Sequence, residues 1–345
     1  MAPVGFAVLG VDHPHALGMA AGLLAAGAVC RGYWTPDPSA GAARAFAERF
    51  PQVAAIPYGQ LVEDPSTALV ATAAVPDRRA GIAVDAMRNG KDVLTAKPGC
   101  LTLDELALVE RTRAETGRLW SVWFSERLAS AATVRAARLV AEGAVGRVVH
   151  VLGLGPHRLD APTRPGWFFD AERAGGILAD LAAHQADQFL QITGADPARV
   201  RVVSSASGNL GHPEHPRFAD FGDVVLAAPG CRGYARVDWF TPDGLPTWGD
   251  GRLVVTGTDG YLEVRKYVDL GGRPGGDHLF LADGASVRRI DCTDVPLTFF
   301  PDLLADVAHR TETALPPGRA AAATALALRA QRDAEPCDSP APQPG

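Results

Sequence analysis

Short apolar runs alternate with helical patterns over the first 125 residues of the chain. Residues 101–117 are the clearest helical pattern, because Thr102 and Glu105 form a candidate capping box at its start. Five runs have the length of buried strands, and four segments between them have helical periodicity: 4–10, 29–34, 68–74, 92–96 and 119–124, and 14–27, 39–50, 78–89 and 101–117. This alternation predicts an α/β fold with a doubly wound parallel sheet over residues 1–125.

The pattern changes to a run of strands after about residue 145. Strand candidates separated by turn signals lie at 147–155, 199–208, 223–228, 234–240, 251–258 and 260–267. Helical segments are expected at 175–192, 299–313 and 318–333. Residues 126–333 are therefore expected to form an α+β domain with a large, mostly antiparallel sheet. Residues 334–345 have the composition of a disordered tail.

Composition narrows the class of protein. Apolar residues make up 47% of the chain and charged residues 21%, which is typical of a globular protein. The net charge of −6 argues against nucleic-acid binding, and no apolar run has the length of a membrane span. The start of the chain lacks a basic segment, and the five cysteines form no CxxC pair. We therefore expect a cytoplasmic protein with neither a nucleic-acid nor a membrane partner.

The loop after the first strand occupies the place of a dinucleotide-binding glycine loop. Such loops read GxGxxG, and the pyrophosphate lies on the N-terminus of the next helix. Here Gly10 is retained, but Asp12 and His15 take the places of the second and third glycines. The positional candidates for cofactor contact are Gly10, Asp12, His13, Pro14 and His15. The alternatives are ordinary loop and cap residues, or a metal site, and we expect no metal because Pro14 as the first helical residue explains the loop.

The ends of the second and third strands supply further cofactor candidates. Thr35 stands where an NAD site usually has an acid for the ribose hydroxyls, and Asp37 follows two residues later. No arginine adjoins Thr35 to hold a 2′-phosphate. The cofactor is therefore expected to be NAD or NADP, with a slight preference for NAD through Asp37. Ala73, in the third strand, is a further candidate for cofactor contact.

Two separated motifs carry the candidate chemistry. Lys97 and Pro98 follow the strand 92–96, at the end where open α/β sheets bind ligands. Asp180 and His184 lie four residues apart in the predicted helix 175–192 and would share one face, which Asp187 continues. A carboxylate and an imidazole on one face suit proton transfer coupled to hydride transfer. A solvated lysine and an incidental histidine remain the alternative.

These motifs together resemble the glucose–fructose oxidoreductase/inositol dehydrogenase/MocA family over about residues 4–330. The resemblance rests on Ala96-Lys97-Pro98, on the GG-x-L-x-D-x-x-x-H pattern from Gly175 to His184, on 144–147 and on 256–264. It implies a Rossmann domain that binds NAD or NADP, and hydride transfer at a carbinol carbon of a sugar, cyclitol or similar polyhydroxylated molecule. Ala96 departs from the glutamate of the family motif.

The resemblance also assigns roles to individual residues. Lys97 and His184 become the proton-transfer candidates, and Asp180 binds substrate or orients the cluster. Arg79 stands where many members have a histidine, and it is a candidate for cofactor contact, as are Lys97 and Pro98. The candidate substrate contacts, besides Lys97, Asp180 and His184, are Arg127, His157, Arg158, Arg164 and Trp167.

Three functional hypotheses follow from these residues. The first is an NAD(P)-dependent dehydrogenase or reductase. The second is a glycoside-eliminating or hydrolysing enzyme that keeps its cofactor bound, and the third is a non-catalytic sugar or nucleotide sensor on the same fold. Because family members commonly oligomerise through the second-domain sheet, the resemblance also implies a homo-oligomer, a dimer or tetramer.

Overall fold

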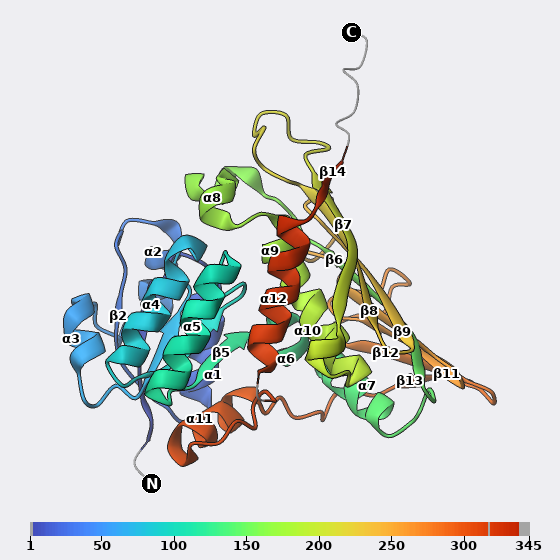
Figure 1. The fold of residues 1–345 in the computed structure, drawn as a ribbon, viewed down its shortest axis with the longest axis horizontal. Helices are drawn as coiled ribbons and strands as arrows, with labels where there is room; N and C mark the ends of the chain where they lie inside the picture. The colour runs from blue at the N-terminus through green and yellow to red at the C-terminus, as the bar shows by residue number, and fades with distance from the viewer. Residues whose placement is uncertain (1–2, 317, 338–345) are drawn as a thin grey trace. The chain divides into compact units, whose positions relative to one another are not determined.

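The computed structural model describes residues 3–316 and 318–337 and divides the chain into two compact units. The first unit comprises 1–123 with 298–321, and the second comprises 124–297 with 322–345 (Figure 1). The sequence assigned 298–321 to the second domain, whereas the structure groups this segment with the first unit. The reason is packing: α11 (Phe299–His309) lies on α1 (His15–Ala25), where the Phe300 ring occupies the space that a Cβ at Gly22 would need.

The described part of the first unit contains a five-stranded parallel sheet. Its strands lie in the order β2-β1-β3-β4-β5, so the strand order reverses between β1 and β3. The strands are β1 (Gly5–Leu9), β2 (Val29–Trp34), β3 (Leu69–Thr72), β4 (Asp92–Ala96) and β5 (Trp120–Trp123). All residues of β1, β3, β4 and β5 are buried, as helices on both faces of a parallel sheet require. The expected doubly wound sheet is confirmed.

Helices connect the strands of the first unit where the periodicity predicts them. Besides α1 and α11 these are α2 (Gly41–Arg49), α4 (Pro76–Arg88), α5 (Leu103–Thr116) and the unpredicted short α3 (Tyr58–Glu63). The Thr102 hydroxyl accepts a hydrogen bond from the Glu105 amide at 3.0 Å, and the Glu105 carboxylate accepts one from the Thr102 amide at 3.2 Å. The predicted capping box is therefore confirmed, and Gly117 ends α5 in the left-handed conformation.

The described part of the second unit contains a nine-stranded mixed sheet in the order β13-β12-β11-β10-β6-β9-β8-β7-β14. Two neighbouring pairs, β6–β9 and β7–β14, are parallel and the others are antiparallel. The strands are β6 (Val148–Pro156), β7 (Arg201–Gly208), β8 (Phe221–Ala228), β9 (Cys231–Asp238), β10 (Arg252–Gly257), β11 (Gly260–Arg265), β12 (His278–Asp283), β13 (Val287–Ile290) and β14 (Glu335–Pro336). The expected large, mostly antiparallel sheet is confirmed.

Strand β14 corrects part of the predicted tail. Glu335 and Pro336 pair in parallel with Ala206 and Ser207 of β7, so the tail prediction is wrong for these two residues. The backbone hydrogen bonds of an edge strand hold them, a long-range interaction that composition cannot reveal. Residues 338–345 of the predicted tail lie outside the described residues.

One predicted helix is divided into two. Instead of a continuous helix over 175–192, α9 (Ile177–Asp180) ends before Leu181 and α10 (Ala182–Thr193) follows it. The Gln331 side chain accepts hydrogen bonds from amides at the start of α9, at 2.9 Å from Leu178, so a tertiary contact stabilises this short helix. The other helices that begin after residue 123 are α6 (Ser125–Leu128), α7 (Ala131–Ala141), α8 (Ala171–Ala174), α12 (Arg319–Arg332) and three short 3₁₀ turns.

Helices of the second unit cover its sheet. Helix α10 contacts β6, β8 and β9, and α7 contacts β11 and β12. Strand β6 packs against α10, and His157 follows directly after its end. Among the described residues, no helix combines the length and the apolar character needed to cross a membrane.

Candidate active site

The loops that follow β1 and β3 meet at the point where the strand order reverses. Gly10 has a φ of +84°, and its carbonyl accepts a hydrogen bond from the Ala73 amide at 3.0 Å. A Cβ added to Gly10 would lie 2.4 Å from the Cβ of Ala74. Glycine is therefore required both by the backbone conformation and by the close approach of the two loops. Gly10 and Ala73, both candidates for cofactor contact, are brought together.

The polar side chains of the first loop are engaged within the unit. The Asp12 carboxylate accepts a hydrogen bond from the Val75 amide at 3.2 Å, and His13 Nδ1 accepts one from the His15 amide at 3.1 Å. The His13 and His15 rings lie edge to face, and His15 makes a similar contact with Trp123. The described residues contain no His, Cys, Asp or Glu group arranged to hold a metal ion. The structure thus gives the metal alternative no support.

The loop after β2 presents its acid to solvent. Asp37 is exposed, and its Oδ1 accepts hydrogen bonds from the amide and hydroxyl of Ser39 at 2.9 Å and 2.6 Å. These hydrogen bonds lower the pKa of Asp37. The Thr35 hydroxyl lies 3.3 Å from the Asp37 amide. An ionised, pre-oriented carboxylate at the end of β2 is suited to accept hydrogen bonds from ribose hydroxyls.

Lys97 lies at the end of β4 and is 4% exposed. The buried Arg79 donates hydrogen bonds to the carbonyls of Ala74, at 2.7 Å, and of Lys97. The sequence proposed Arg79 as a cofactor contact, and that assignment stays a prediction. The Arg79 side chain is 1% exposed. The hydrogen bonds show a second role, which is to tie the loop after β3 to the loop that carries Lys97 and Pro98.

A dinucleotide fits the residues at this edge of the first unit. The reversal of strand order, the glycine at its centre and the small Ala73 and Ala74 lie where a cofactor binds in such folds. The Asp12 carboxylate is turned toward the start of α4, and the His15 amide is held by a side-chain acceptor that a phosphate oxygen can replace. These observations favour dinucleotide binding without a complete glycine motif.

The second unit holds a pocket at Asp180 with aromatic walls. Its volume is about 310 Å³, and its lining includes the aromatic side chains of Phe168, Phe218 and Trp239 together with Arg217. Arg164 stacks over the Phe168 and Trp239 rings at 4.6 Å and 5.2 Å. Burial lowers the pKa of Arg164, while the nearby charge of Asp180 opposes that effect. The pocket therefore joins a carboxylate to aromatic faces, a combination that suits a sugar-like ring.

His184 lies in α10 and is 2% exposed. Its ring makes an edge-to-face contact with Phe124 at 6.4 Å. Asp187 does not extend the site, because it is fully buried and pairs with both nitrogen positions of the Arg127 fork at 2.5 Å and 2.8 Å. Arg127, a predicted substrate contact, thus joins α6 to α10. Its role toward substrate stays a prediction.

The other predicted substrate contacts lie after β6. His157 shares a hydrogen bond with the Gly155 carbonyl at 3.0 Å and packs on Trp239 and Trp248. Arg158 donates to backbone carbonyls in the 242–245 loop, and Arg164 donates to those of Leu159 and Arg158. Trp167 is half-buried and is not among the residues that line the Asp180 pocket. The sequence missed Phe218, which no local pattern distinguishes from a core residue.

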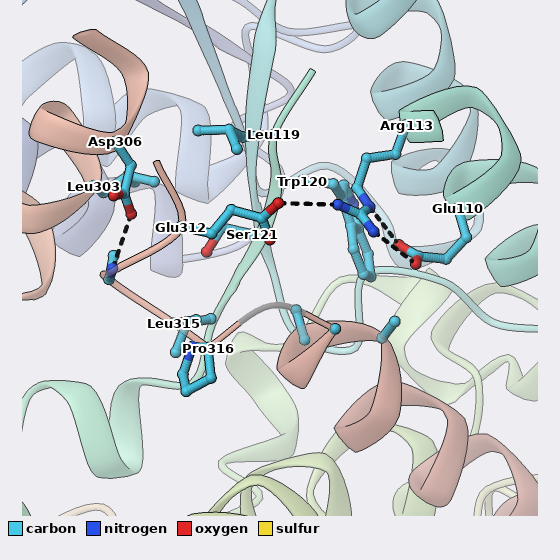
Figure 2. A pocket seen from close by; sticks show the side chains of 14 residues that line it. Glu110, Arg113, Leu119, Trp120, Ser121, Leu303, Asp306, Glu312, Leu315 and Pro316 are labelled. Carbon is cyan, nitrogen blue, oxygen red and sulfur yellow. Dashed lines mark hydrogen bonds and ion pairs between the residues drawn. The ribbon is translucent and has the colours of Figure 1, made fainter. Parts of the chain in front are cut away.

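A second pocket belongs to the first unit and has a different character. Residues of α5, of β5, of α11 and of the segment after α11 line a space of about 430 Å³. Figure 2 shows that Arg113 pairs with both Glu110 and Glu312, and Asp306 accepts a hydrogen bond from the Ala314 amide at 2.8 Å. Because its charged groups bind one another and none of the predicted site residues lines it, we regard this pocket as structural.

Comparisons with known proteins agree with this architecture. A family model described as the GFO/IDH/MocA C-terminal domain matches residues 133–263. The 1,5-anhydro-D-fructose reductase of Ensifer adhaerens is 30% identical over 43% of this chain and 44% of its own length. The scyllo-inositol 2-dehydrogenase (NAD(+)) of Bacillus subtilis is 27% identical over 60% of this chain and 58% of its own length. The matches therefore span about half the length of these curated relatives.

Solved structures extend the similarity over the whole chain. A protein from Erwinia carotovora atroseptica described as an oxidoreductase is 42% identical, with a TM-score of 0.92 over 97% of this chain and 100% of that one. A levoglucosan dehydrogenase in complex with NADH and levoglucosan shares the fold, with a TM-score of 0.76, 19% identity and 96% of each chain covered. The chain belongs to the Gfo/Idh/MocA family of oxidoreductases.

Proposed function

We propose that the protein is an NAD(P)-dependent oxidoreductase that transfers hydride to or from a carbinol carbon of a sugar, cyclitol or similar polyhydroxylated molecule. Lys97 and His184 take part in proton transfer, and Asp180 binds the substrate or orients it. The observation that carries the proposal is the Asp180 pocket, whose lining combines this carboxylate with the rings of Phe168, Phe218 and Trp239. Such a site can accept a hydroxyl hydrogen bond while an aromatic face packs on the C–H face of a sugar ring.

The first unit supports the cofactor assignment. Gly10 and Ala73 bring two loops together at the reversal of strand order, and Asp37 holds a carboxylate at the end of β2. The nicotinamide, when bound, supplies or receives the hydride. We propose NAD rather than NADP, because the ionised Asp37 would repel a 2′-phosphate. The relatives include a dehydrogenase named for NAD(+) and a structure that contains NADH.

The residues of the chain have separate tasks in the proposed reaction. Oxidation of a carbinol removes a hydride from carbon and a proton from oxygen, so the site needs a base beside the hydroxyl. Lys97 and His184 supply the two candidate groups, and both are almost fully buried. Burial excludes bulk water, so a proton moves between the substrate and these side chains rather than to solvent. The Asp180 carboxylate would accept a hydrogen bond from a substrate hydroxyl.

A cofactor titration followed by a polyol screen tests the proposal. Reduced nicotinamide fluorescence should change on binding, with a lower Kd for NADH than for NADPH, and Asp37→Ser should reduce that preference. Lys97→Met should lower kcat by at least about 100-fold while the Kd for NADH stays within a few-fold of that of the parent. Lys91→Met is the control, because Lys91 donates to the Asp64 carbonyl and is remote from the end of β4.

Each alternative function has its own outcome. Failure to bind NAD, NADP and their reduced forms would exclude both enzyme hypotheses. Glycoside cleavage with no net change in nicotinamide absorbance would favour the eliminating enzyme. Tight sugar binding with no redox change across the screen would favour the sensor. Full activity of His184→Asn would remove His184 from the chemistry.

A further inference from the structure

A buried ion pair lies next to α10 in the second unit. The Lys266 ammonium contacts Glu126 Oε2 at 2.7 Å, and each of the two residues is 2% exposed. Gln185 and Gln188 of α10 direct their amides to the same oxygen, at 3.0 Å and 3.4 Å. The other oxygen, Oε1, is buried and accepts no hydrogen bond from the described residues. An unsatisfied buried carboxylate oxygen is costly, so its retention calls for an explanation other than stability.

Two glycines of β6 create the space for this polar layer. A Cβ at Gly153 would lie 2.3 Å from Gln185 Oε1. A Cβ at Gly155 would lie 2.8 Å from Gln185 Nε2 and 3.6 Å from Glu126 Oε1. Both glycines face the helices because alternate residues of a strand share a face. The sheet is thus shaped to admit a carboxylate and an amide where apolar side chains would normally pack.

The carboxylate is electrostatically coupled to the histidines of the site. Burial raises the pKa of Glu126, but the charges of Lys266, His184 and His157 and the hydrogen bond from Lys266 outweigh it, so the pKa lies well below its usual range. The geometry agrees with this coupling, because the Gln188 amide that reaches Glu126 Oε2 also donates a hydrogen bond to the His184 carbonyl at 3.0 Å. The low polarity of the surroundings strengthens this interaction relative to one at the surface.

We propose that Glu126, held ionised and in place by Lys266, is a positioning residue that provides the counter-charge for His184. When the imidazole accepts the hydroxyl proton of a carbinol it becomes cationic, and the carboxylate offsets that charge. The carbon-bound hydride, with its two electrons, is transferred to the oxidised nicotinamide. The charge that Glu126 offsets is therefore that of the proton on His184. The catalytic use of His184 rests on the proposed function, whereas its coupling to Glu126 is measurable without substrate.

Other charges around α10 are paired or turned away. On α6, Arg127 pairs with Asp187 of α10, and on α7, Arg135 pairs with Glu142 at the surface while Arg138 is exposed. Since Gly222 and Gly233 face the helices, the alternation of β8 and β9 turns Asp223, Arg232 and Arg236 to the opposite face of the sheet. The other titratable residues to name near α10 are Asp180 on α9, His157 after β6 and Tyr267, which follows Lys266 in the chain.

Histidine NMR titration of the whole protein tests the proposal. With ¹³C-labelled histidine rings, the His184 signal is assigned by its loss in His184→Asn. Glu126→Gln, which keeps the shape and removes the charge, should lower the His184 titration midpoint by about 1 pH unit or more. Lys266→Met should also lower it, because the buried carboxylate loses the charge that keeps it ionised. Glu142→Gln is the matched control and should leave the midpoint unchanged.

The charge-conserving variant Lys266→Arg separates a charge effect from a structural one and should leave the midpoint near that of the parent. A midpoint that falls as far in Lys266→Arg as in Lys266→Met would indicate a general disturbance of the buried layer and would overturn the proposal, as would an unchanged midpoint in Glu126→Gln. If Glu126→Gln does not fold, as judged by circular dichroism, Glu126→Asp and Lys266→Met decide: an unchanged midpoint in Lys266→Met overturns the proposal. If the variants shift the His184 midpoint as expected but the protein oxidises no polyol, the proposed function is refuted and the coupling to Glu126 is not.

Discussion

The guanidinium of Arg79 donates a hydrogen bond to the backbone carbonyl of Lys97, eighteen residues later in the chain. The same side chain donates to the Ala74 carbonyl at 2.7 Å and reaches the Ala96 carbonyl at 3.4 Å. One buried arginine therefore fixes the loop after β3 to the end of β4. The position of the candidate proton-transfer lysine depends on this side chain, which itself need not touch substrate.

Replacement of Arg79 should affect both stability and turnover. Arg79→Lys keeps the charge but cannot reach the same carbonyls with one planar fork. We expect the free energy of unfolding in urea to fall by about 1–3 kcal/mol, and kcat to fall with little change in the Kd for reduced cofactor. Arg78→Lys, at the exposed neighbouring position, should behave like the parent. Parental stability and kcat in Arg79→Lys would contradict the role assigned to Arg79.

Two separate effects require glycine at position 10, namely its left-handed backbone conformation and its close approach to Ala74. Gly10 and Gly27 have φ values of +84° and +92°, but a Cβ meets Ala74 only at Gly10 and has no atom within 4 Å at Gly27. Both alanine variants should lose about 1 kcal/mol from the left-handed backbone. Gly10→Ala should lose more, and should also weaken NADH binding as measured by fluorescence. Equal losses in the two variants would show that the contact with Ala74 is relieved at no cost.

Asp306 should make the first unit sensitive to acid. Burial raises the pKa of Asp306, but hydrogen bonds from Thr311, Thr313 and Ala314 lower it below its ordinary value. A lowered pKa in the folded state adds stability above the unfolded value of about 3.9, and this stability is lost as the pH falls through the folded value. Asp306→Asn should therefore lower the free energy of unfolding by about 1–3 kcal/mol at neutral pH, and by less below about pH 4.

Urea unfolding between pH 3 and 7 measures this dependence. Asp294→Asn, at an exposed position, controls for the loss of one negative charge. A deficit in Asp306→Asn that stays constant over this range would show that the carboxylate is not the group responsible.

Filling the Asp180 pocket should weaken substrate binding selectively. Ala219 contributes to the wall of this pocket, so Ala219→Leu reduces its volume without removing a charged group. We expect KM for a turned-over polyol to rise at least about tenfold, with an unchanged Kd for NADH. Ala195→Leu makes the same change beside a different pocket of the second unit and should leave KM unaltered. A KM that stays at the parental value in Ala219→Leu would place the substrate elsewhere.

The uncovered face of the second-unit sheet is the proposed oligomer interface. Gly153 faces α10, so Leu152 points to the opposite face, where it lies across from Val254 of β10. Leu152→Asp should therefore reduce the molar mass measured by light scattering after size exclusion. Leu270→Asp, at a 61% exposed position of the turn after β11, is the control. A parental mass that is monomeric, or one unaffected by Leu152→Asp, would contradict this assignment.

Local sequence determined the type of most elements. The short apolar runs form the buried strands of the sheet. The Thr102–Glu105 capping box begins α5, and both of its hydrogen bonds are made within four residues of the chain. Lys97 was placed at the end of a strand by the same kind of short-range signal. The short strands β12 and β13 carried a weaker pattern and were not predicted.

Tertiary contacts decided the chemistry around the candidate residues. The sequence placed Asp180 and His184 on one helix, but α9 ends at Asp180, and the Leu178 amide near its start donates a tertiary hydrogen bond to the Gln331 side chain. Glu126 and Lys266, 140 residues apart, meet because β6 leaves room beside its glycines. Periodicity records which face of an element is buried, whereas the partner of a buried charge depends on which distant segment packs there. The sequence by itself therefore determined most of the elements and the resemblance to the family, and only the folded chain revealed that Arg79 binds the Lys97 carbonyl and that Lys266 meets Glu126 beside α10.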